Sequence, residues 1–577
     1  MTRKHVCMLI LLACTYIFPS LKTQAQENLY QTPTGDKHEV RAVWLTTIMG
    51  LDWPRQKART ATQTEIQKRE LTDILDKLQR ANINTVLLQT RIRGSVIYPS
   101  KYEPWDECLT GTPGLAPTYD PLAFAVEECH KRGMELHAWV VSIPVGKTDK
   151  QRRFGSSALP RKHPELCKQA GGEWFMIPGH PATADYIANI CKEIAENYDI
   201  DGISLDYIRY PESIYRFSDK QLYRSTSGLS FNEWKRENID RIVREVHNKV
   251  KAVKPWVKLS SSPIGKYNDL PRQSSGGWNC YNAVSQDPKR WLEKGWQDVL
   301  FPMMYFRGDN YYPFLCDWSE GSHGRPVAAG LGIYFLDPRE GRWTINEVRQ
   351  QIHATRMVGN GGVCFYRSDF LTRNLQGLYD KVCDEFFPLP ALQPQMWWAD
   401  DKQAPSPPMN LQMKDGRLTW EESTDNTTSV SYTVYGWYGD PDTAQINNAT
   451  NIIATALRNC ECDVTAFISR NNCFAVTASD RFGNESKPTF VYQVEKQRIP
   501  PFHNDAHMLH PDADSLLHID KTKTFYGLRL TDAEGRTIRT SRRPSISTKG
   551  LAQGWYRLVI DRKKSSAVVG DLLICDK

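Results

Sequence analysis

The sequence has little net charge and lacks the short motifs that mark metal, nucleotide or serine-hydrolase sites. Lys and Arg number 73 and Asp and Glu number 66, and three of the positive charges lie within the first 25 residues, which leaves +4 beyond them. A surplus that small excludes a nucleic-acid footprint. No HExxH, EF-hand, Walker A, GxSxG or paired CxxC pattern is present, so we expect neither a metal nor another cofactor.

Long apolar runs are also missing after the N-terminus. Two basic residues precede an apolar run that begins at Val6, and Thr23-Gln24-Ala25 offers small residues for cleavage. This pattern predicts a signal peptide over residues 1–25 rather than a membrane span, which needs about 20 apolar residues. The run ending at Cys14 also resembles a lipobox, which would make Cys14 a lipid anchor. We expect an exported protein of the periplasm or cell envelope, or a secreted one, without a transmembrane segment.

Cysteine is present but unpatterned. Twelve cysteines lie beyond residue 25, and their spacings repeat no pair. Cys460 and Cys462 are too close for a usual zinc knuckle and have no His nearby. We expect mostly buried free thiols that fill small apolar spaces, while export would permit a few disulfides.

Apolar strand-like runs alternate with amphipathic helices between about residues 38 and 388. Runs such as Val86-Leu87-Leu88 are typical of strands covered on both faces. Eight strands are predicted, at 40–48, 85–91, 135–142, 202–206, 257–263, 298–305, 327–335 and 362–366. This order predicts an α/β fold, a (β/α)8 TIM barrel over residues 26–390. A doubly wound open sheet is the alternative, which the strand count and the lack of a Gly-rich phosphate loop disfavour.

Proline marks the later boundaries. Residues 391–408 are Pro-rich and predict an extended linker. Residues 409–495 alternate like strands and resemble a fibronectin type III module, with an early Trp420 and a Tyr-x-x-Tyr strand at 432–435. A further proline pair precedes residues 503–577, which predict a second small β-sandwich. We assign no chemistry to these two all-β domains.

The chemistry of a TIM barrel lies in the loops that follow its strands. Asp206 ends the fourth predicted strand, with Arg209 and Tyr210 in the loop behind it. A carboxylate there can act as nucleophile, base or charge stabiliser toward an oxocarbenium-like centre, and Arg209 would keep it ionised. The competing interpretation is a structural pair at the barrel rim.

Glycosidic cleavage usually needs a second, protonated carboxyl. Glu103, in the loop after the second strand, is our first candidate because Pro104 and Trp105 would desolvate it and raise its pKa. A loop Glu held by a nearby Arg explains the same pattern. Asp369, after the eighth strand, and Asp309, after the sixth, are the reserves.

Aromatic and guanidinium side chains near the strand ends suit a saccharide. The predicted substrate-binding set is Trp44, Arg91, Arg93, His137, Trp139, Arg209, Tyr210, Tyr305 and Asp369. Core packing explains each aromatic singly, and His137 alone is more typical of a hydrogen-bonded barrel histidine than of a catalyst. The convergence of these side chains on strand ends is what indicates a binding site.

Several motifs together resemble the glycosyl hydrolase-like 10 family. They are Val40–Thr47 with Leu51-Asp52-Trp53-Pro54, Gln89–Gly94, Glu103-Pro104-Trp105 with the stretch to Gly111, His137-Ala138-Trp139 and Asp201–Pro211. The resemblance implies a glycosidase-type TIM barrel in an exported bacterial protein, often followed by small β domains, and cleavage of peptidoglycan strands stripped of peptide. Many relatives carry two adjacent acids at the fourth strand end, where this chain has Asp206 followed by Tyr207.

The sequence therefore predicts an exported glycoside hydrolase with a polysaccharide substrate, Asp206 as the principal catalytic residue and Glu103 as its acid. Two alternatives stay open. One is a hydrolase of another polysaccharide, and the other is a non-catalytic glycan-binding surface protein on the same scaffold.

Overall fold

A computed structural model describes residues 36–492, apart from 225–227, 272–276 and 428, and also 511, 515–519, 527–532, 535–551, 554–562 and 565–574. The predicted signal peptide, Cys14 and the proline pair at 500–501 lie outside the described residues. Across the described ranges, no helix combines the length and apolar character needed to cross a bilayer.

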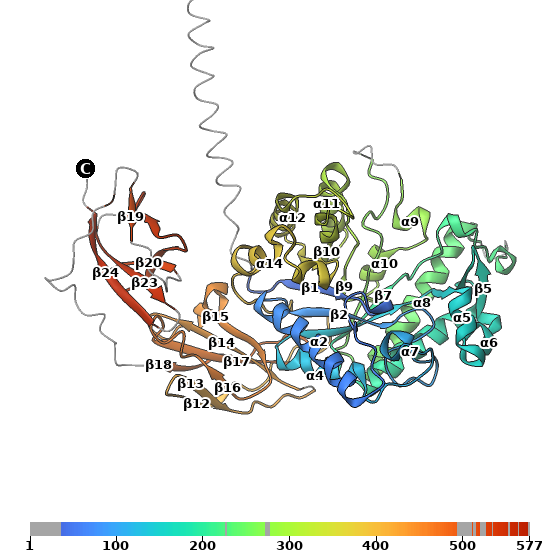
Figure 1. Ribbon diagram of the computed structural model, residues 1–577, viewed down its shortest axis with the longest axis horizontal. Coiled ribbons are helices and arrows are strands. Elements are labelled where there is room, and N and C mark those ends of the chain that lie inside the picture. The colour runs from blue at the N-terminus through green and yellow to red at the C-terminus, as the bar shows by residue number, and fades with distance from the viewer. Residues whose placement is uncertain are drawn as a thin grey trace, which may run out of the picture.

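Eight parallel strands close into a barrel in the order β1-β11-β10-β9-β8-β7-β3-β2, which confirms the predicted fold (Figure 1). The strands are β1 (Val40–Leu45), β2 (Thr85–Arg91), β3 (Glu135–Val141), β7 (Gly202–Asp206), β8 (Lys258–Ser261), β9 (Val299–Leu300), β10 (Val327–Leu331) and β11 (Gly361–Phe365). Each overlaps a predicted strand. All eight begin at one end of the barrel, here called the bottom, and finish at the other, here called the mouth.

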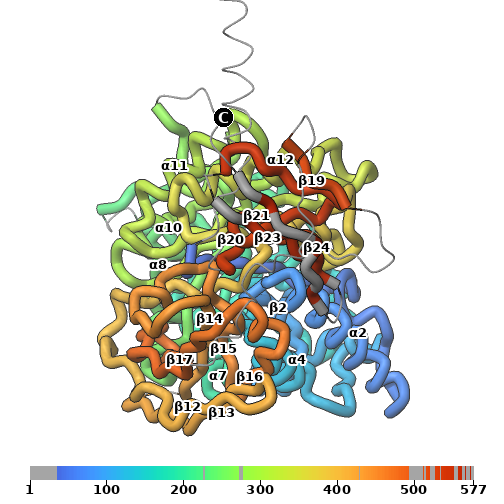
Figure 2. Tube along the Cα trace, turned by 90° about the vertical axis from the view of Figure 1, so that its left-hand side faces the viewer, coloured from blue at the N-terminus to red at the C-terminus, as the bar shows by residue number. Residues whose placement is uncertain are grey.

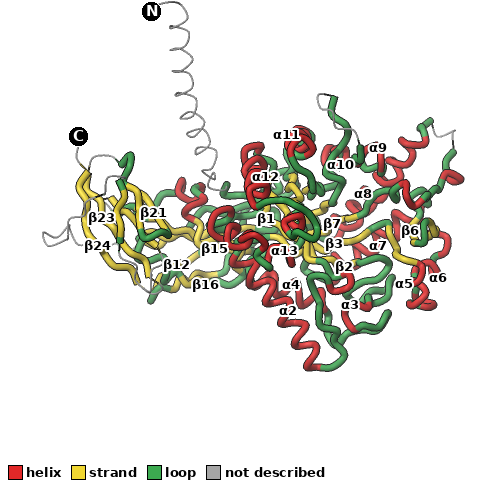
Figure 3. Tube along the Cα trace, turned by 45° about the horizontal axis from the view of Figure 1, so that its top comes forward, coloured by secondary structure: helices red, strands yellow, loops and turns green. Residues whose placement is uncertain are grey.

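Helices surround the barrel strands, and Figure 3 shows them in red around the yellow strands. The longer ones are α2 (Ala61–Arg80), α4 (Pro121–Lys131), α7 (Pro181–Asn197), α8 (Phe231–Val253), α11 (Tyr312–Glu320) and α12 (Ile345–Val358). Capping boxes start α2 at Thr60 and α8 at Ser230, where they satisfy backbone N–H groups that the helix leaves unpaired. Leu71, Leu75 and Leu78 then bury the inner face of α2.

The barrel interior is a separate packed core. Its members include Ala42, Trp44, Leu87, Trp139, Phe301 and Cys364. Gly330 on β10 leaves room for the indole of Trp44, because a Cβ there would lie 3.0 Å from Trp44 Cη2 and 2.6 Å from the carbonyl oxygen of Pro302. The interior is therefore filled with side chains and is not a channel.

A small antiparallel sheet that the sequence pattern did not predict lies in the connection after β3. It contains β4 (Pro144–Lys147), β6 (Glu173–Met176) and β5 (Cys167–Ala170), in that order. Each strand has only four residues, too few for a clear alternating pattern. The sheet stands beside the mouth and supplies one wall of the candidate site.

Small antiparallel sheets follow the barrel, as Figure 2 shows in orange and red. Residues 409–492 form β12-β13-β16 and β15-β14-β17-β18, and the two sheets share a core that includes Leu418, Trp420, Tyr432, Val434 and Phe474. The strands are β12 (Met409–Lys414), β13 (Arg417–Glu421), β14 (Ser431–Trp437), β15 (Ile452–Leu457), β16 (Glu461–Asp463), β17 (Cys473–Ser479) and β18 (Thr489–Tyr492). The fibronectin type III assignment stays a prediction.

The last part of the chain forms two further sheets, β19-β22 and β21-β20-β23-β24, around a shared core. Their strands are β19 (Leu516–His518), β20 (Gly527–Asp532), β21 (Thr537–Ser541), β22 (Ser545–Ser547), β23 (Gly554–Arg562) and β24 (Ser565–Ile574). Every cysteine in the described ranges is a free thiol, most of them buried.

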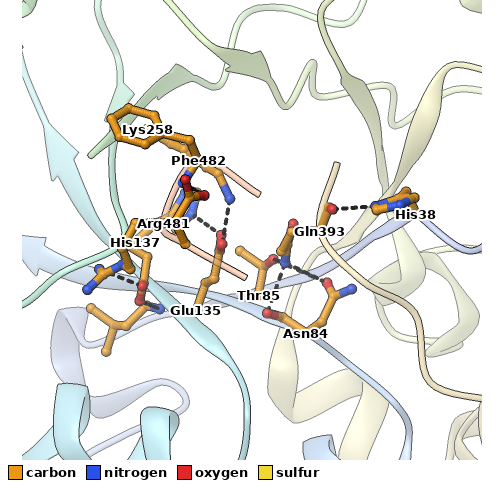
Figure 4. Close-up of polar contacts among 12 residues, drawn as sticks. His38, Asn84, Thr85, Glu135, His137, Lys258, Gln393, Arg481 and Phe482 are labelled. Atoms are coloured by element: carbon orange, nitrogen blue, oxygen red, sulfur yellow. Dashed lines mark hydrogen bonds and ion pairs between the residues drawn. The ribbon is translucent and has the colours of Figure 1, made fainter. Parts of the chain in front are cut away.

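The segment predicted as an extended linker packs against the bottom of the barrel. Gln393 donates its side-chain amide to the Asn84 carbonyl oxygen, at 3.1 Å, and to Thr85 Oγ1, at 2.6 Å (Figure 4). Trp398 Nε1 donates to Asp298 Oδ1 at 2.8 Å. These contacts cover the bottom with the protein's own chain.

Ion pairs, one of them buried, join residues 409–492 to the same end. Arg481 binds Asp201 at 2.8 Å and Asp199 at 2.7 Å. Asp201 also accepts from the Leu136 backbone N–H and contacts His130 Nε2, both at 2.8 Å. Although burial opposes it, the nearby Arg481 and His130 hold the pKa of Asp201 below its ordinary value.

Candidate active site

Asp206 lies at the mouth end of β7 with its carboxylate held on both oxygens. Trp139 Nε1 donates to Oδ2 at 3.0 Å, and the Tyr207 backbone N–H donates to Oδ1 at 2.7 Å. Burial raises the pKa of this carboxyl, while the Arg209 charge and these two hydrogen bonds oppose the rise without cancelling it. A buried carboxyl with a raised pKa at a barrel mouth is typical of a catalytic group.

The chain turns sharply after Asp206. Tyr207 adopts φ of +50°, a left-handed conformation that a residue with a side chain rarely takes. This turn brings the Tyr207 N–H onto the carboxylate of the preceding residue. Strained backbone of this kind collects at functional sites.

Aromatic rings from four strand ends pack together at the mouth of the barrel. Trp44 lies 5.8 Å from Tyr366 and 6.5 Å from Tyr305, centroid to centroid, and Tyr305 lies 5.4 Å from Tyr366. Tyr334 packs edge-on against Tyr305 at 5.8 Å. Burial raises the pKa of the Tyr305 and Tyr366 hydroxyls, and the Asp206 charge adds to the rise. Such a wall suits the apolar face of a sugar ring.

A hollow of about 520 Å³ opens beside Tyr207. Arg93 and Arg209 line it, and their guanidinium carbons lie 5.9 and 4.3 Å from the centroid of the Tyr207 ring. Arg93 Nη1 contacts Glu173 Oε2 at 3.5 Å, and Arg209 Nη2 donates to Glu212 Oε1 at 2.7 Å. The structure therefore brings Arg93 and Arg209 together next to Asp206.

Glu103 and Arg91, both predicted at the site, bind each other instead. Arg91 donates from Nη2 to Oε1 at 2.6 Å and from Nε to Oε2 at 2.9 Å, and the two side chains are 1% and 0% exposed. Arg91 also donates to the carbonyl oxygen of Ser142 at 2.8 Å. The pair ties the loop after β2 to the end of β3, and no hydrogen bond joins Glu103 to Asp206 within the described ranges. The acid role of Glu103 stays a prediction.

His137 lies at the other end of the barrel. It pairs in register with Gly202, the first residue of β7, whereas Asp206 is the last. At about 3.3 Å per residue the two are about 13 Å apart along the strand. His137 contacts Glu135, which also binds Lys258 (Figure 4). The structure does not bring His137 to the site, and it uses the side chain in a polar cluster at the bottom.

Two predicted residues stand at the margin of the site. Tyr210 turns its hydroxyl away, donating to Asp219 at 3.0 Å and accepting from Asn238 at 3.1 Å, while it lines the hollow. Asp369 is held by Arg55 at 2.6 Å and by Arg373 at 3.1 Å. Asp309, the other reserve, is exposed in a short turn after β9.

Asp52 and Tyr366 are rim residues that the sequence interpretation missed. Asp52 accepts from the backbone and hydroxyl of Thr46, at 2.7 and 2.8 Å, and from the Asp369 backbone N–H at 3.2 Å, and it also binds Arg367. Burial raises its pKa and the Arg367 charge opposes this. The sequence held a signal for each residue. Tyr366 directly follows a strand, and Asp52 is an acidic residue soon after β1.

Comparison of the sequence with known proteins identifies a family. The family model described as glycosyl hydrolase-like 10 matches residues 39–316. The chain is 31% identical over 480 residues to "Glycosyl hydrolase YngK" of Bacillus subtilis (strain 168), covering 78% of this chain and 92% of that protein. The chain belongs to the glycosyl hydrolase-like 10 family.

A second relative in this comparison is "Glycosyl hydrolase DigH" of Escherichia coli (strain K12), 30% identical over 407 residues, which cover 63% of this chain and 93% of that protein. Among solved structures, the PgaB (BpsB) glycoside hydrolase domain from Bordetella bronchiseptica matches with a TM-score of 0.44 and 13% identity, over 60% of this chain and 99% of that one. The family assignment rests on the sequence relatives.

Proposed function

We propose that the protein is an exported glycoside hydrolase that cleaves glycosidic bonds in peptidoglycan strands from which the peptides have been removed. Asp206 carries the proposal, because it is a buried carboxyl with a raised pKa that accepts a hydrogen bond from Trp139 at a barrel mouth lined by aromatic side chains. Membership of the glycosyl hydrolase-like 10 family supports hydrolysis. The substrate rests on the family resemblance.

Asp206 acts in this proposal as the ionised carboxylate toward the anomeric centre. The second carboxyl is best sought in the hollow, where Glu212 has one oxygen bound by Arg209 and the other without a hydrogen bond from the described residues. Its side chain is 25% exposed, so a substrate can reach it. Glu103, with both oxygens bound to Arg91, has no such access.

The test is product release from purified peptidoglycan, with and without prior amidase removal of the stem peptides. Wild type should release soluble fragments with new reducing ends from the stripped strands, and Asp206→Asn should lower the rate at least 10³-fold. Release from neither preparation, with binding retained in a pull-down, would replace the hydrolase with a glycan-binding protein. Cleavage of another polysaccharide alone would replace the substrate.

The two glutamates give a matched pair. Glu212→Gln should slow turnover by about 10²–10⁴-fold at unchanged thermal stability. Glu103→Gln should lower the melting temperature, because it leaves the buried guanidinium of Arg91 without its counter-charge. Rates and melting curves measured on both variants separate the roles, and normal turnover in Glu212→Gln would remove it as the second carboxyl.

Export is part of the proposal and rests on the N-terminal pattern. The mature N-terminus, identified by mass spectrometry of the protein from its host, should begin at Gln26 for simple cleavage or at a lipid-modified Cys14 for an anchored form. An unprocessed N-terminus in the cytoplasmic fraction would contradict export.

A further inference from the structure

Unpaired polar groups gather beside Asp206. Arg209 is buried, and its Nε and Nη1 have no hydrogen-bond partner among the described residues, while Nη2 binds Glu212. Ser262 directly follows the last residue of β8. It is 1% exposed, and its Oγ likewise has no hydrogen-bond partner among the described residues. The Ser262 N–H donates to the Leu205 carbonyl oxygen at 3.1 Å, which fixes this serine next to Asp206.

Buried donors without partners are unfavourable in a folded protein. Their concentration around one candidate catalytic carboxyl indicates that a ligand completes them. Aromatic rings pack close to the guanidinium of Arg209, whose carbon lies 4.3 Å from the centroid of Tyr207 and 5.4 Å from that of Trp278. The unpaired Nε and Nη1 lie on the edge of this group, where its N–H donors point.

The charges of the hollow limit what this ligand group can be. Arg209 is paired with Glu212 and Arg93 with Glu173, and Asp206 adds a further carboxyl. Because the positive charges of the hollow are already paired, the hollow does not favour an anionic ligand. It favours a neutral group that offers a strong acceptor to Arg209, which only donates, and a donor to Ser262, which can accept.

We propose that Arg209 and Ser262 bind the 2-acetamido group of the sugar residue whose glycosidic bond faces Asp206. Arg209 donates to the amide carbonyl oxygen, and Ser262 accepts from the amide N–H. Sugar hydroxyl groups also donate and accept, but the acetamido group combines an amide carbonyl oxygen, which is a stronger acceptor than a hydroxyl oxygen, with an N–H donor. This assignment rests on the proposed function, and it names the feature of the glycan that the site selects.

Binding measurements on the Asp206→Asn variant test the assignment without turnover. Titration calorimetry compares stripped glycan strands in three forms: native, chemically de-N-acetylated, and re-acetylated. De-N-acetylation should weaken binding at least tenfold, and re-acetylation should restore it. Equal binding of the three forms, or binding of none, would overturn the assignment.

A second substitution in the same background assigns the effect to Arg209. Arg209→Gln should weaken binding of native strands about tenfold and abolish the preference for acetylated ones, and Ser262→Ala should reduce that preference. Arg244→Gln, a half-exposed arginine of α8, is the matched control and should bind as the parent does. If Arg209→Gln instead strengthens binding of de-N-acetylated strands and keeps full binding of native ones, simple charge repulsion replaces our assignment.

The outcomes separate the two proposals. A wild type that releases no product but prefers acetylated strands would overturn hydrolysis and leave the acetamido site standing. A wild type that cleaves native and de-N-acetylated strands equally would overturn the acetamido site and leave hydrolysis standing.

Discussion

The proton affinity of Asp206 is set by a balance between burial and four favourable neighbours. Burial raises its pKa, and the Arg209 charge, the Tyr207 N–H, the Trp139 Nε1–H and the Arg93 charge each favour the ionised form. Loss of any one of these neighbours must raise the pKa further, because a carboxylate without a donor is less stable in a buried site.

Trp139→Phe removes one hydrogen bond from Asp206 and keeps the aromatic ring. A bond worth about 1 kcal/mol corresponds to about 0.7 pH unit. If the reaction needs ionised Asp206, the acid limb of kcat/KM against pH should move up by about that amount. Trp398→Phe, which removes an indole hydrogen bond at the bottom, should leave the limb in place. A limb that stays or moves down in Trp139→Phe would contradict the role given to Asp206.

The sequence was enough to place single residues on strand ends, but it did not show which of these side chains bind one another. Asp206, Trp139, Trp44 and Tyr305 come together as the strand pattern indicates. Glu103 and Arg91 were both selected for the site. The sequence left open that Glu103 is held by a nearby Arg, but it did not identify that partner as Arg91, because the ion pair depends on how the loop after β2 folds back onto the strand.

At the scale of elements, the sequence predicted the barrel strands better than the structure of the long loops between them. Eight apolar runs were enough to predict the barrel, although β9 has only two residues, Val299–Leu300, where eight were expected. Beyond Leu300 the regular strand gives way to isolated bridges, in which Met303 pairs with Ile264 and with Gly330. The sheet β4-β6-β5 was missed, since its strands carry too few residues for a periodic signal.

Close packing between β3 and β7 gives a test of the barrel interior. A Cβ at Gly202 would lie 2.6 Å from His137 Nδ1, so Gly202→Ala should lower the free energy of unfolding by about 2 kcal/mol through overpacking. His137→Ala should relieve part of that loss, giving a coupling of about 1 kcal/mol in a double-mutant cycle measured by urea unfolding. Additive effects would contradict the contact. Turnover per folded molecule should stay normal, because the pair lies far from Asp206.

At the scale of the whole molecule, the barrel and residues 409–492 are joined by buried charges. Arg481 binds Asp201 and Asp199, and Met396 N–H donates to the Phe482 carbonyl oxygen at 2.7 Å. The Pro-rich composition of residues 391–408 predicted a spacer. Composition does not reveal docking, which here depends on Gln393 and Trp398 meeting the strand starts.

Arg481→Met should weaken this junction. It leaves Asp201 buried without its main counter-charge, so stability should fall by about 3 kcal/mol. Calorimetry should show residues 409–492 unfolding apart from the barrel. Arg417→Met breaks an exposed pair in the same region and should cost less than about 0.5 kcal/mol. Equal losses of stability in the two variants would show that the buried pair stabilises the protein no more than an exposed pair does.

The same junction predicts a pH dependence. The folded pKa of Asp201 lies below its unfolded value, so the pair contributes stability above about pH 4, and that contribution falls as the pH drops further. Wild type should therefore lose stability below about pH 4 more steeply than Arg481→Met. Parallel profiles of the two proteins, measured by urea unfolding between pH 3 and 7, would contradict the assignment.

The covered bottom also makes the two ends of the barrel different from each other. The chain enters the barrel at β1 beside residues 391–398, where the Leu392 N–H donates to the Lys37 carbonyl oxygen at 2.8 Å. The entering chain and the docked sheets therefore share one end, and Asp206 faces out of the other. A polymer that reaches Asp206 therefore approaches from the end of the barrel opposite the docked sheets.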